Sequence, residues 1–484
     1  MNAKIKKTSK NNLQSVPYRL HPKMHPMIRE VMEQKDFIFY LMKKYGSPLN
    51  LIFPQIFREK YELFDQMLRG EHLNYRLYYT CKPNRSNALL REAAELGAYV
   101  DVSSHGEFQA ALQVGIEPEK ISATGPKNKV YMDIIIENQS MCVIDNWHEL
   151  EYISTYARLG QPVMVRLSKP LINSAVSDDT FGLPYNELNQ IIQTIKNTAT
   201  LDFYGFAVHY NYRTEINVAH IETVVSATLQ AFEGGLSPKA VNIGGGYLVR
   251  YVDCKDDWND FINHIKGSLK GNNEPVTWDG NGMGFRLQNG TVIGTEGFMN
   301  HCEPVTCENH LEKVLYSTLE CLDGTSLLDF IRDSGLEIYV EPGRALMDQC
   351  GVTLANVEFT KKSSKGNLLV NLDMHYANLN AHTFKYMAEP VLIHRNDNLP
   401  PNQEGVYYYG SLCFASDLIT FHKTFPDYLP ENGDIAAFIN TAAYRMDFTE
   451  SEMLRHPNAV KICITQNDNQ WMEITDNDYK KDQS

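Results

Sequence analysis

A lysine follows an apolar run in the stretch from Arg76 to Ser104, RLYYTCKPNRSNALLREAAELGAYVDVSS. Two apolar runs around a helical stretch, in about thirty residues, have the length of one βαβ unit, whose right-handed crossover brings both strand ends to one rim. The pattern therefore predicts Lys82 and Asp101 at the same rim. In a (β/α)₈ barrel the active site lies at this rim, so Lys82 is a candidate catalytic residue. The alternative is that its amine only extends into solvent.

Other strand ends carry groups suited to a phosphorylated, planar ligand. The segment VNIGGGY has glycines 244–246, whose backbone N–H groups could surround an anion, although a flexible turn explains them equally well. The segment IYVEPGRA offers Glu341 for a protonated ring nitrogen and Arg344 for phosphate, or forms a Pro-Gly turn with a surface pair. His209 in AVHYNY could stack on a ring, or be a core histidine.

Eight apolar runs separated by helical stretches precede Arg344 and predict an α/β fold, a closed (β/α)₈ TIM barrel. These runs are residues 77–81, 98–104, 120–125, 142–146, 162–168, 203–210, 240–246 and 337–344. The rhythm is broken by an insertion at about 250–325, where FRLQ and TVIG flank Asn289 and Gly290, a strong hairpin signal.

After Arg344 the runs are β-rich and lack long helices, which predicts an all-β second domain, an antiparallel barrel or sandwich. We expect strands at residues 352–362, 367–374, 406–413, 435–444 and 459–465. The predicted organisation is a lead-in over 1–36 that partly joins the C-terminal domain, a barrel over 37–344, and a β-rich domain over 345–484.

Composition excludes several classes of function. The 484 residues carry a formal net charge of −14, which argues against nucleic acid as a partner. No apolar run reaches the roughly 18 residues of a membrane span, and the basic N-terminus lacks the apolar core of a signal peptide. The nine cysteines are scattered, as in a reduced cytoplasmic protein, so we expect a cytoplasmic location and a small-molecule substrate.

Seven motifs in this order resemble the fold-type III pyridoxal-phosphate decarboxylases, which have alanine-racemase-like barrels and include diaminopimelate, ornithine and arginine decarboxylases. The motifs are YYTCKPN, AYVDVSS, AVHYNY, NIGGGY, VEPGRA, GSLCFASD and NTAAY, and they span nearly the whole chain after its first thirty or so residues. The resemblance implies an amino-acid decarboxylase whose cofactor, pyridoxal 5′-phosphate, is held by Lys82 as a Schiff base.

The resemblance also implies a role for each matching position. Asp101 and Arg166 would support the lysine and its site, and His209 would stack on the cofactor ring. Glu341 would keep the ring nitrogen protonated, which favours decarboxylation over racemisation. The phosphate would be held by Gly244, Gly245, Gly246, Gly343 and Arg344, with Tyr444 closing over it.

The C-terminal domain would complete the site of a second subunit. Cys413 matches the cysteine that returns a proton to the product, and Asp417 would reach the same site, so the resemblance implies a homodimer with shared active sites. A non-catalytic regulator on this scaffold and an amino-acid racemase stay as alternatives. Lys82, Glu341 and Cys413 argue against the regulator, and Glu341 and the cysteine motif argue against the racemase.

Phe414 departs from the family pattern. Members that act on basic amino acids usually have an acid after the cysteine, which pairs with the distal end of the substrate. With Phe414 at this position, the distal ammonium of a substrate would lose a charge-assisted hydrogen bond worth roughly 1.5 to 3 kcal/mol. Ornithine and diaminopimelate are therefore doubtful substrates. A siderophore-type intermediate or an amino acid carried on a protein is a better expectation.

The insertion contains a second cluster, HCEPVTCENH. Its four soft side chains could bind zinc, but the spacing matches no standard site and we expect no metal. They are His301, Cys302, Cys307 and His310.

Overall fold

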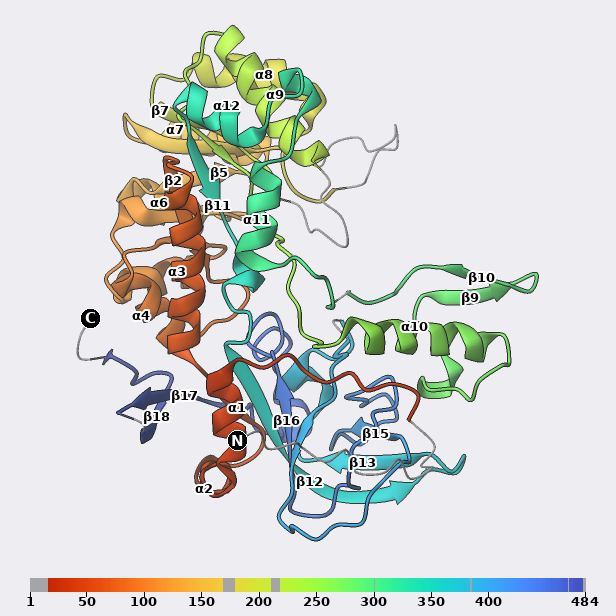
Figure 1. Cartoon of the computed structure of the whole chain (residues 1–484). Helices are drawn as coiled ribbons and strands as arrows, with labels where there is room; N and C mark the ends of the chain where they lie inside the picture. Colours follow the sequence, from red (N-terminus) through yellow and green to blue (C-terminus); the bar gives the residue numbers. More distant parts are fainter. Residues whose placement is uncertain are drawn as a thin grey trace, which may run out of the picture.

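The computed structural model describes residues 16–168, 179–209, 218–299, 301–383, 385–468 and 470–481. Within them the chain forms a closed parallel barrel and a second, mostly antiparallel sheet, with an elongated arm beside the second sheet (Figure 1). Among the described residues, no helix is long and apolar enough to span a membrane.

Eight parallel strands close the barrel in the order β11-β2-β3-β4-β5-β6-β7-β8. They are β2 (Tyr75–Thr80), β3 (Tyr99–Val102), β4 (Ile121–Ala123), β5 (Met141–Ile144), β6 (Gln161–Arg166), β7 (Leu201–Ala207), β8 (Ala240–Asn242) and β11 (Glu337–Val340). Each overlaps one of the eight predicted runs, so the predicted barrel is confirmed. It differs in extent, because the predicted runs continue into the loops that follow several strands.

Alternation along each strand separates the barrel interior from its outer face. Tyr78, Met164 and Tyr339 belong to a small buried cluster that is separate from the main core. Leu77 and Tyr79, on either side of Tyr78, belong instead to the main core, which includes the surrounding helices. The interior is therefore filled by side chains, and the chemistry is confined to the rim.

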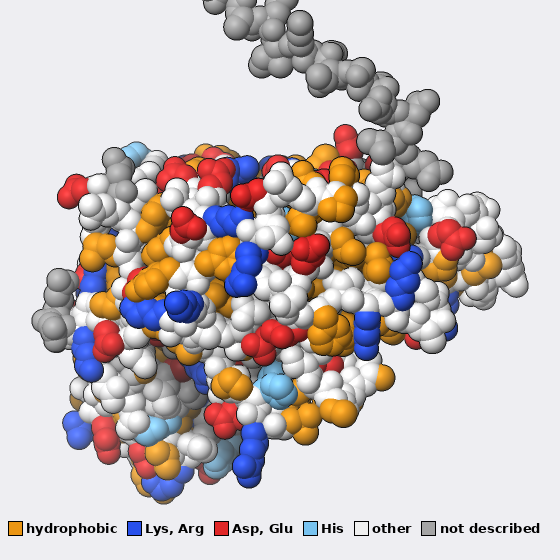
Figure 2. All heavy atoms as spheres, turned by 90° about the horizontal axis from the view of Figure 1, so that it is seen from below, with side chains coloured by type: hydrophobic (Ala, Val, Ile, Leu, Met, Phe, Trp, Pro, Cys, Tyr) orange, Lys and Arg blue, Asp and Glu red, His pale blue; other side chains and the backbone are white. Residues whose placement is uncertain are grey.

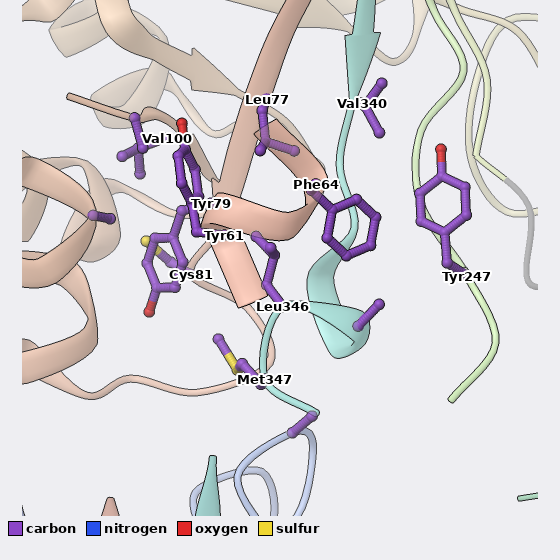
Figure 3. Packing of buried hydrophobic residues seen from close by; sticks show 14 of the residues in the cluster. Tyr61, Phe64, Leu77, Tyr79, Cys81, Val100, Tyr247, Val340, Leu346 and Met347 are labelled. Carbon is purple, nitrogen blue, oxygen red and sulfur yellow. The ribbon is translucent and has the colours of Figure 1, made fainter. Parts of the chain in front are cut away.

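Helices surround the barrel, make up the lead-in segment and form part of the insertion. They are α1 (Pro26–Glu33), α2 (Lys35–Tyr45), α3 (Pro54–Gly70), α4 (Asn87–Glu95), α5 (His105–Gln113), α6 (Lys129–Asn138), α7 (Trp147–Tyr156), α8 (Leu188–Lys196), α9 (Ala219–Glu233), α10 (Lys255–Leu269), α11 (Cys307–Leu315) and α12 (Leu327–Ser334). In α3 the buried residues recur at helical spacing, and Tyr61 and Phe64 lie on the side of the helix near Leu77 and Tyr79 (Figure 3). This contact fixes the strand that leads to Lys82.

The second sheet has the order β14-β16-β12-β1-β17-β18, and β13 and β15 extend it from β12. Its strands are β1 (Leu49–Ile52), β12 (Gly351–Lys362), β13 (Leu368–Leu372), β14 (Val391–Ile393), β15 (Val406–Tyr409), β16 (Ile435–Ile439), β17 (Val460–Asn467) and β18 (Gln470–Thr475). Two pairs, β1 with β17 and β13 with β15, are parallel, whereas the sequence predicted only antiparallel pairs.

The barrel was expected to begin at residue 37, but the chain first contributes a strand to the other sheet. Strand β1 pairs with β12 and β17, whose residues lie some three hundred or more positions later. The sequence analysis missed β1 because a strand of four buried residues next to a helix has no alternation to identify it.

The insertion forms the arm, which projects beside the second sheet (Figure 1). The arm consists of α10 and the hairpin of β9 (Phe285–Gln288) and β10 (Thr291–Gly294), which confirms the predicted hairpin. Trp258 and Phe261 of α10 share a buried cluster with Tyr18 and with side chains of the second sheet. This part of the insertion therefore shares a core with the C-terminal domain, whereas the buried side chains of α11 belong to the main core.

Charges of both signs are interspersed on the lower face of the molecule. Figure 2 shows acidic and basic side chains lying close together on this face, with hydrophobic side chains between them. Within its described residues this face has no continuous basic surface of the kind that binds a phosphate backbone.

Candidate active site

Lys82 and Asp101 lie at one rim of the barrel, as the sequence predicted. Strand β2 pairs with β3 so that Thr80 is opposite Asp101, and the Cys81 N–H donates to the Asp101 carbonyl at 3.0 Å. Two residues beyond β2, Lys82 is exposed, whereas Asp101 is 3% exposed. The amine is thus accessible beside a buried acid.

The Asp101 carboxyl group is buried without a full set of hydrogen bonds. No donor among the described residues bonds to its Oδ1. Burial raises the pKa of Asp101 well above its usual value and the nearby Glu341 raises it further, while Lys82 and the Thr124 hydroxyl lower it. A cation that enters beside Lys82 would be favoured by this acid.

Glu341 follows β11 and is held by two neighbours. Asn242 Nδ2 donates to its Oε1 at 2.7 Å, and His209 Nδ1 lies 3.9 Å from its Oε2. Burial raises the pKa of Glu341, while Asn242, Lys82 and Arg166 lower it. The carboxyl group therefore faces a histidine and two cationic side chains from different strands of the barrel.

Two of the three glycines after β8 lie where backbones approach too closely for a side chain. A Cβ on Gly245 would lie 1.9 Å from the Glu341 carbonyl oxygen, and one on Gly244 would lie 2.4 Å from the Val208 carbonyl oxygen. Gly244 also has a φ of +68°, and its N–H donates to Asn242 Oδ1 at 2.8 Å. The glycines are thus required by the fold at this rim, which a flexible turn would not need.

Gly343, Arg344 and Tyr444 come together beside them. Gly343 has a φ of +49°, and a Cβ there would lie 3.8 Å from the Tyr444 hydroxyl. The guanidinium carbon of Arg344 lies 4.7 Å from the centre of the Tyr444 ring. Tyr444 N–H donates to the Pro83 carbonyl at 2.8 Å, which ties the second domain to the loop of Lys82.

Arg166 ends β6 and lies near a further acid, Asp145. Its Nη1 lies 4.0 Å from Asp145 Oδ1, and its guanidinium carbon lies 4.8 Å from the centre of the Phe181 ring. Arg166 also lowers the pKa of Glu341, so it contributes to the field at the rim.

Cys413 and Phe414 lie apart from these groups, on an exposed loop after β15. Cys413 is exposed and Phe414 is 42% exposed. Asp417, which the resemblance places at the site of a second subunit, is 2% exposed in the single chain. Its two carboxylate oxygens accept the N–H groups of Tyr376 and Leu412, each at 2.8 Å, so in a single chain Asp417 holds the loop in shape.

The four possible zinc ligands of the insertion have separate surroundings. His301 packs on Tyr251 with ring centres 4.6 Å apart, and His310 lies near Tyr247. Burial, Arg344 and Arg445 lower the pKa of His301 well below its usual value. Among the described residues, no three histidine, cysteine or acidic side chains gather as metal ligands would.

The barrel rim fits pyridoxal phosphate, which carries an aldehyde, a basic ring nitrogen and a phosphate. An exposed amine lies beside two buried acids with raised pKa values, and Gly245 lies so close to the Glu341 carbonyl oxygen that no side chain fits between them. Buried acids favour a protonated ring nitrogen, and glycine N–H groups with an arginine favour a phosphate.

Sequence reasoning missed Asn242, Thr80 and the segment of residues 376–383. Asn242 orients both Glu341 and the Gly244 N–H, and its position directly before the three glycines was a usable signal. Thr80 Oγ1 would lie 3.2 Å from a Cβ on Gly343. The segment 376–383 has no helical or strand periodicity, so nothing in the sequence linked it to the site.

Comparison with known proteins agrees with the geometry. The profile of the family described as "Pyridoxal-dependent decarboxylase, pyridoxal binding domain" matches residues 55–277. Diaminopimelate decarboxylase of Staphylococcus aureus (strain COL) is 23% identical over 84% of this chain and 85% of its own. The L-glutamyl-[BtrI acyl-carrier protein] decarboxylase of Niallia circulans is 22% identical over 87% of this chain and 90% of its own.

A solved structure shows the same fold. The lysine/ornithine decarboxylase of Vibrio vulnificus, crystallised with putrescine, superimposes with a TM-score of 0.63 at 19% identity, over 89% of this chain and 98% of the other. The profile, the relatives and the barrel with its second sheet agree on one conclusion. The chain belongs to the fold-type III pyridoxal-phosphate-dependent decarboxylases, and is an amino-acid decarboxylase with pyridoxal 5′-phosphate as its cofactor.

Proposed function

We propose that the enzyme removes the α-carboxylate of an amino acid or amino-acid conjugate at the barrel rim, with Lys82 as the residue that binds the cofactor aldehyde. The observation that carries this proposal is the exposed Lys82 amine beside two buried acids, Asp101 and Glu341. When bound, pyridoxal phosphate accepts the electron pair that the departing carbon dioxide leaves behind.

Glu341 is the group that holds a proton at the ring nitrogen. Its contact with Asn242 fixes one carboxylate oxygen, and the other oxygen, which lies 3.9 Å from His209 Nδ1, would be available to a ring nitrogen. We assign ring stacking to His209, and phosphate binding to glycines 244–246 together with Gly343, Arg344 and Tyr444. Asp101 and Arg166 set the charge around Lys82.

Cys413 is the proposed proton donor to the product carbon. Its loop contacts its own domain through Asp417, and both Cys413 and Phe414 are exposed in the single chain. The assignment therefore requires a homodimer in which the loop of one subunit enters the barrel mouth of the other.

Phe414 argues against a substrate with a distal ammonium. Its ring is 42% exposed and packs edge-on to Tyr376, with ring centres 6.1 Å apart, so it presents an apolar surface next to the proton donor. A conjugated substrate accords with this surface, and the Niallia circulans relative is named for an amino acid on an acyl-carrier protein. A racemase or a non-catalytic regulator is disfavoured by Glu341, Lys82 and Cys413.

The proposal is tested by carbon dioxide release from candidate substrates. Ornithine, lysine and diaminopimelate are compared with glutamate, with glutamyl conjugates of phosphopantetheine and with citrate-linked diamino acids. We expect release from a conjugate or a non-basic amino acid, and a value of kcat/KM for ornithine that is lower by about tenfold or more. Release from ornithine or diaminopimelate with the highest kcat/KM would contradict the substrate assignment, and interconversion of enantiomers without release would favour a racemase.

A further inference from the structure

Thr80, the last residue of β2, carries a buried hydroxyl group. The side chain is 6% exposed, and no group among the described residues bonds to its Oγ1. A buried hydroxyl without a hydrogen bond destabilises a fold, so such a group is rare unless a ligand supplies the partner. In this segment the resemblance gave a role to Lys82 alone.

The hydroxyl lies on the inner face of the barrel, just below the rim. Side chains alternate along a strand, so Thr80 shares the face of Tyr78, which belongs to the buried cluster inside the barrel. Lys82 follows two residues later. Thr80 is therefore one step deeper in the barrel than the amine that is proposed to bind the cofactor aldehyde.

Strand β2 lies between β11 and β3, and the Thr80 hydroxyl is on the side of β11. A Cβ on Gly343, which follows β11, would lie 3.2 Å from Thr80 Oγ1 and 3.8 Å from the Tyr444 hydroxyl. On the other side Asp101 of β3 is opposite Thr80 in register, yet Thr80 Oγ1 bonds to neither of its carboxylate oxygens. Two hydroxyl groups from different domains therefore lie close to one point beside Gly343.

The surroundings of that point are cationic. The guanidinium carbon of Arg344 lies 4.7 Å from the centre of the Tyr444 ring. Burial lowers the pKa of Arg445 to about 10, and the charge of Arg344 contributes to this shift. Two guanidinium groups that repel each other are stabilised by an anion bound next to them. The side of Gly343 therefore suits a phosphate, whereas the buried acids of the rim suit a protonated ring.

We propose that Thr80 is a further cofactor-binding residue, whose hydroxyl donates a hydrogen bond to the phosphate beside Gly343. A hydroxyl rotates its hydrogen toward an available acceptor, and a hydrogen bond to a charged oxygen is stronger than one to a neutral group. Because Thr80 and Lys82 share one strand end, this bond would also fix the position of the cofactor relative to the amine. The inference rests on the proposed function, since it concerns the cofactor that Lys82 binds.

Comparison of two ligands on the full-length protein tests the proposal. Pyridoxal 5′-phosphate and pyridoxal differ only in the phosphate, and the affinity of cofactor-free protein for each is read from the visible band at about 420 nm. Thr80→Val removes the hydroxyl and keeps the shape, and Thr80→Ser keeps the hydroxyl. The matched control is Thr228→Val, because Thr228 is also buried but its hydroxyl donates to the Val224 carbonyl within α9 at 2.8 Å.

We expect Thr80→Val to weaken binding of pyridoxal 5′-phosphate roughly 10- to 100-fold, the size of one hydrogen bond to a charged group, and to change binding of pyridoxal by less than about twofold. Thr80→Ser should retain most of the affinity for pyridoxal 5′-phosphate, and Thr228→Val should retain all of it. In the holoenzyme, the phosphorus NMR resonance of the bound phosphate should shift in Thr80→Val and not in Thr228→Val.

The melting temperature of cofactor-free protein separates this role from a structural one. Since no described residue bonds to the Thr80 hydroxyl, Thr80→Val loses no hydrogen bond within the fold and should melt no lower than wild type. A structural hydroxyl would instead give a lower melting temperature in Thr80→Val.

Three results would overturn the role of Thr80 while the proposed function stands. They are an unchanged affinity of Thr80→Val for pyridoxal 5′-phosphate, an equal loss of affinity for both ligands, and a lower melting temperature of the cofactor-free variant. An equal loss would place the hydroxyl at the ring of the cofactor. If wild type shows no band at about 420 nm with pyridoxal 5′-phosphate, the proposed function and this inference fail together.

Discussion

At the scale of single residues, the chemistry depends on acids that the fold keeps away from water. Asp101 and Glu341 are both buried, and burial is the first cause of the raised pKa of each. A buried acid beside a cation is either protonated or ionised, and the charge of the group that binds next to it decides which form is favoured. These two side chains therefore favour the binding of a protonated cofactor ring at the rim.

Glu341→Gln tests the proposed role of this acid. The amide keeps the shape and a hydrogen bond to Asn242 but cannot hold the ring nitrogen protonated, so we expect kcat to fall by about 10²-fold or more while cofactor still binds. Glu337→Gln is the matched control, because Glu337 lies at the other end of the same strand and pairs with Arg76 at 3.1 Å. Steady-state rates and the visible spectrum are the measurements, and equal losses in the two variants would contradict the role.

At the scale of elements, the sequence was informative where neighbours in the fold are neighbours in the chain. The eight barrel strands were predictable because parallel strands buried on both faces read as continuous apolar runs between helices. The hairpin around Asn289 and Gly290 was predictable from its turn residues. Strand β1 and the segment of residues 376–383 were missed because their partners lie tens to hundreds of residues away.

Glu389 of the second domain contacts the N-terminal segment, and its ionisation offers a test of how the segment is held. Glu389 is 5% exposed beside Leu20, and the Phe425 N–H donates to its carboxylate at 3.2 Å. Burial raises the pKa of Glu389 to about 7 from a usual value of 4.5. The folded state therefore binds this proton more tightly than the unfolded state, so the stabilisation is complete below pH 4.5 and is lost as pH rises toward about 7.

Unfolding by urea, compared between wild type and Glu389→Gln from pH 5 to pH 8, measures this effect. The free energy of unfolding of wild type relative to the variant should decline as pH rises, by an amount on the order of 3 kcal/mol over the full shift, and should level off above about pH 7. A difference that is constant across this range would show that Glu389 does not titrate with folding.

At the scale of the whole molecule, the proposed site needs two chains. Lys82 stands at the barrel rim, while Cys413 is exposed on the second domain and held there by Asp417. An exposed cysteine and phenylalanine on one loop are unexplained in a single subunit. The proposal that they complete a second subunit's site gives each a function.

Mixing two inactive variants tests this arrangement. In a heterodimer of Lys82→Ala with Cys413→Ala, one of the two sites contains both native residues, so random exchange of equal amounts should restore about a quarter of wild-type activity. Each variant alone should be low in activity, and Cys413→Ala should still bind cofactor. If mass spectrometry shows subunit exchange and no activity returns, the shared site is wrong.

The central claim is that Lys82 is the residue that carries the cofactor. Borohydride reduction of the purified protein, followed by peptide mapping, measures this directly. We predict a band at about 420 nm that reduction abolishes, a phosphopyridoxyl adduct on Lys82, and neither the band nor the adduct in Lys82→Ala. An adduct on another lysine, or a band that persists in Lys82→Ala, would contradict the account.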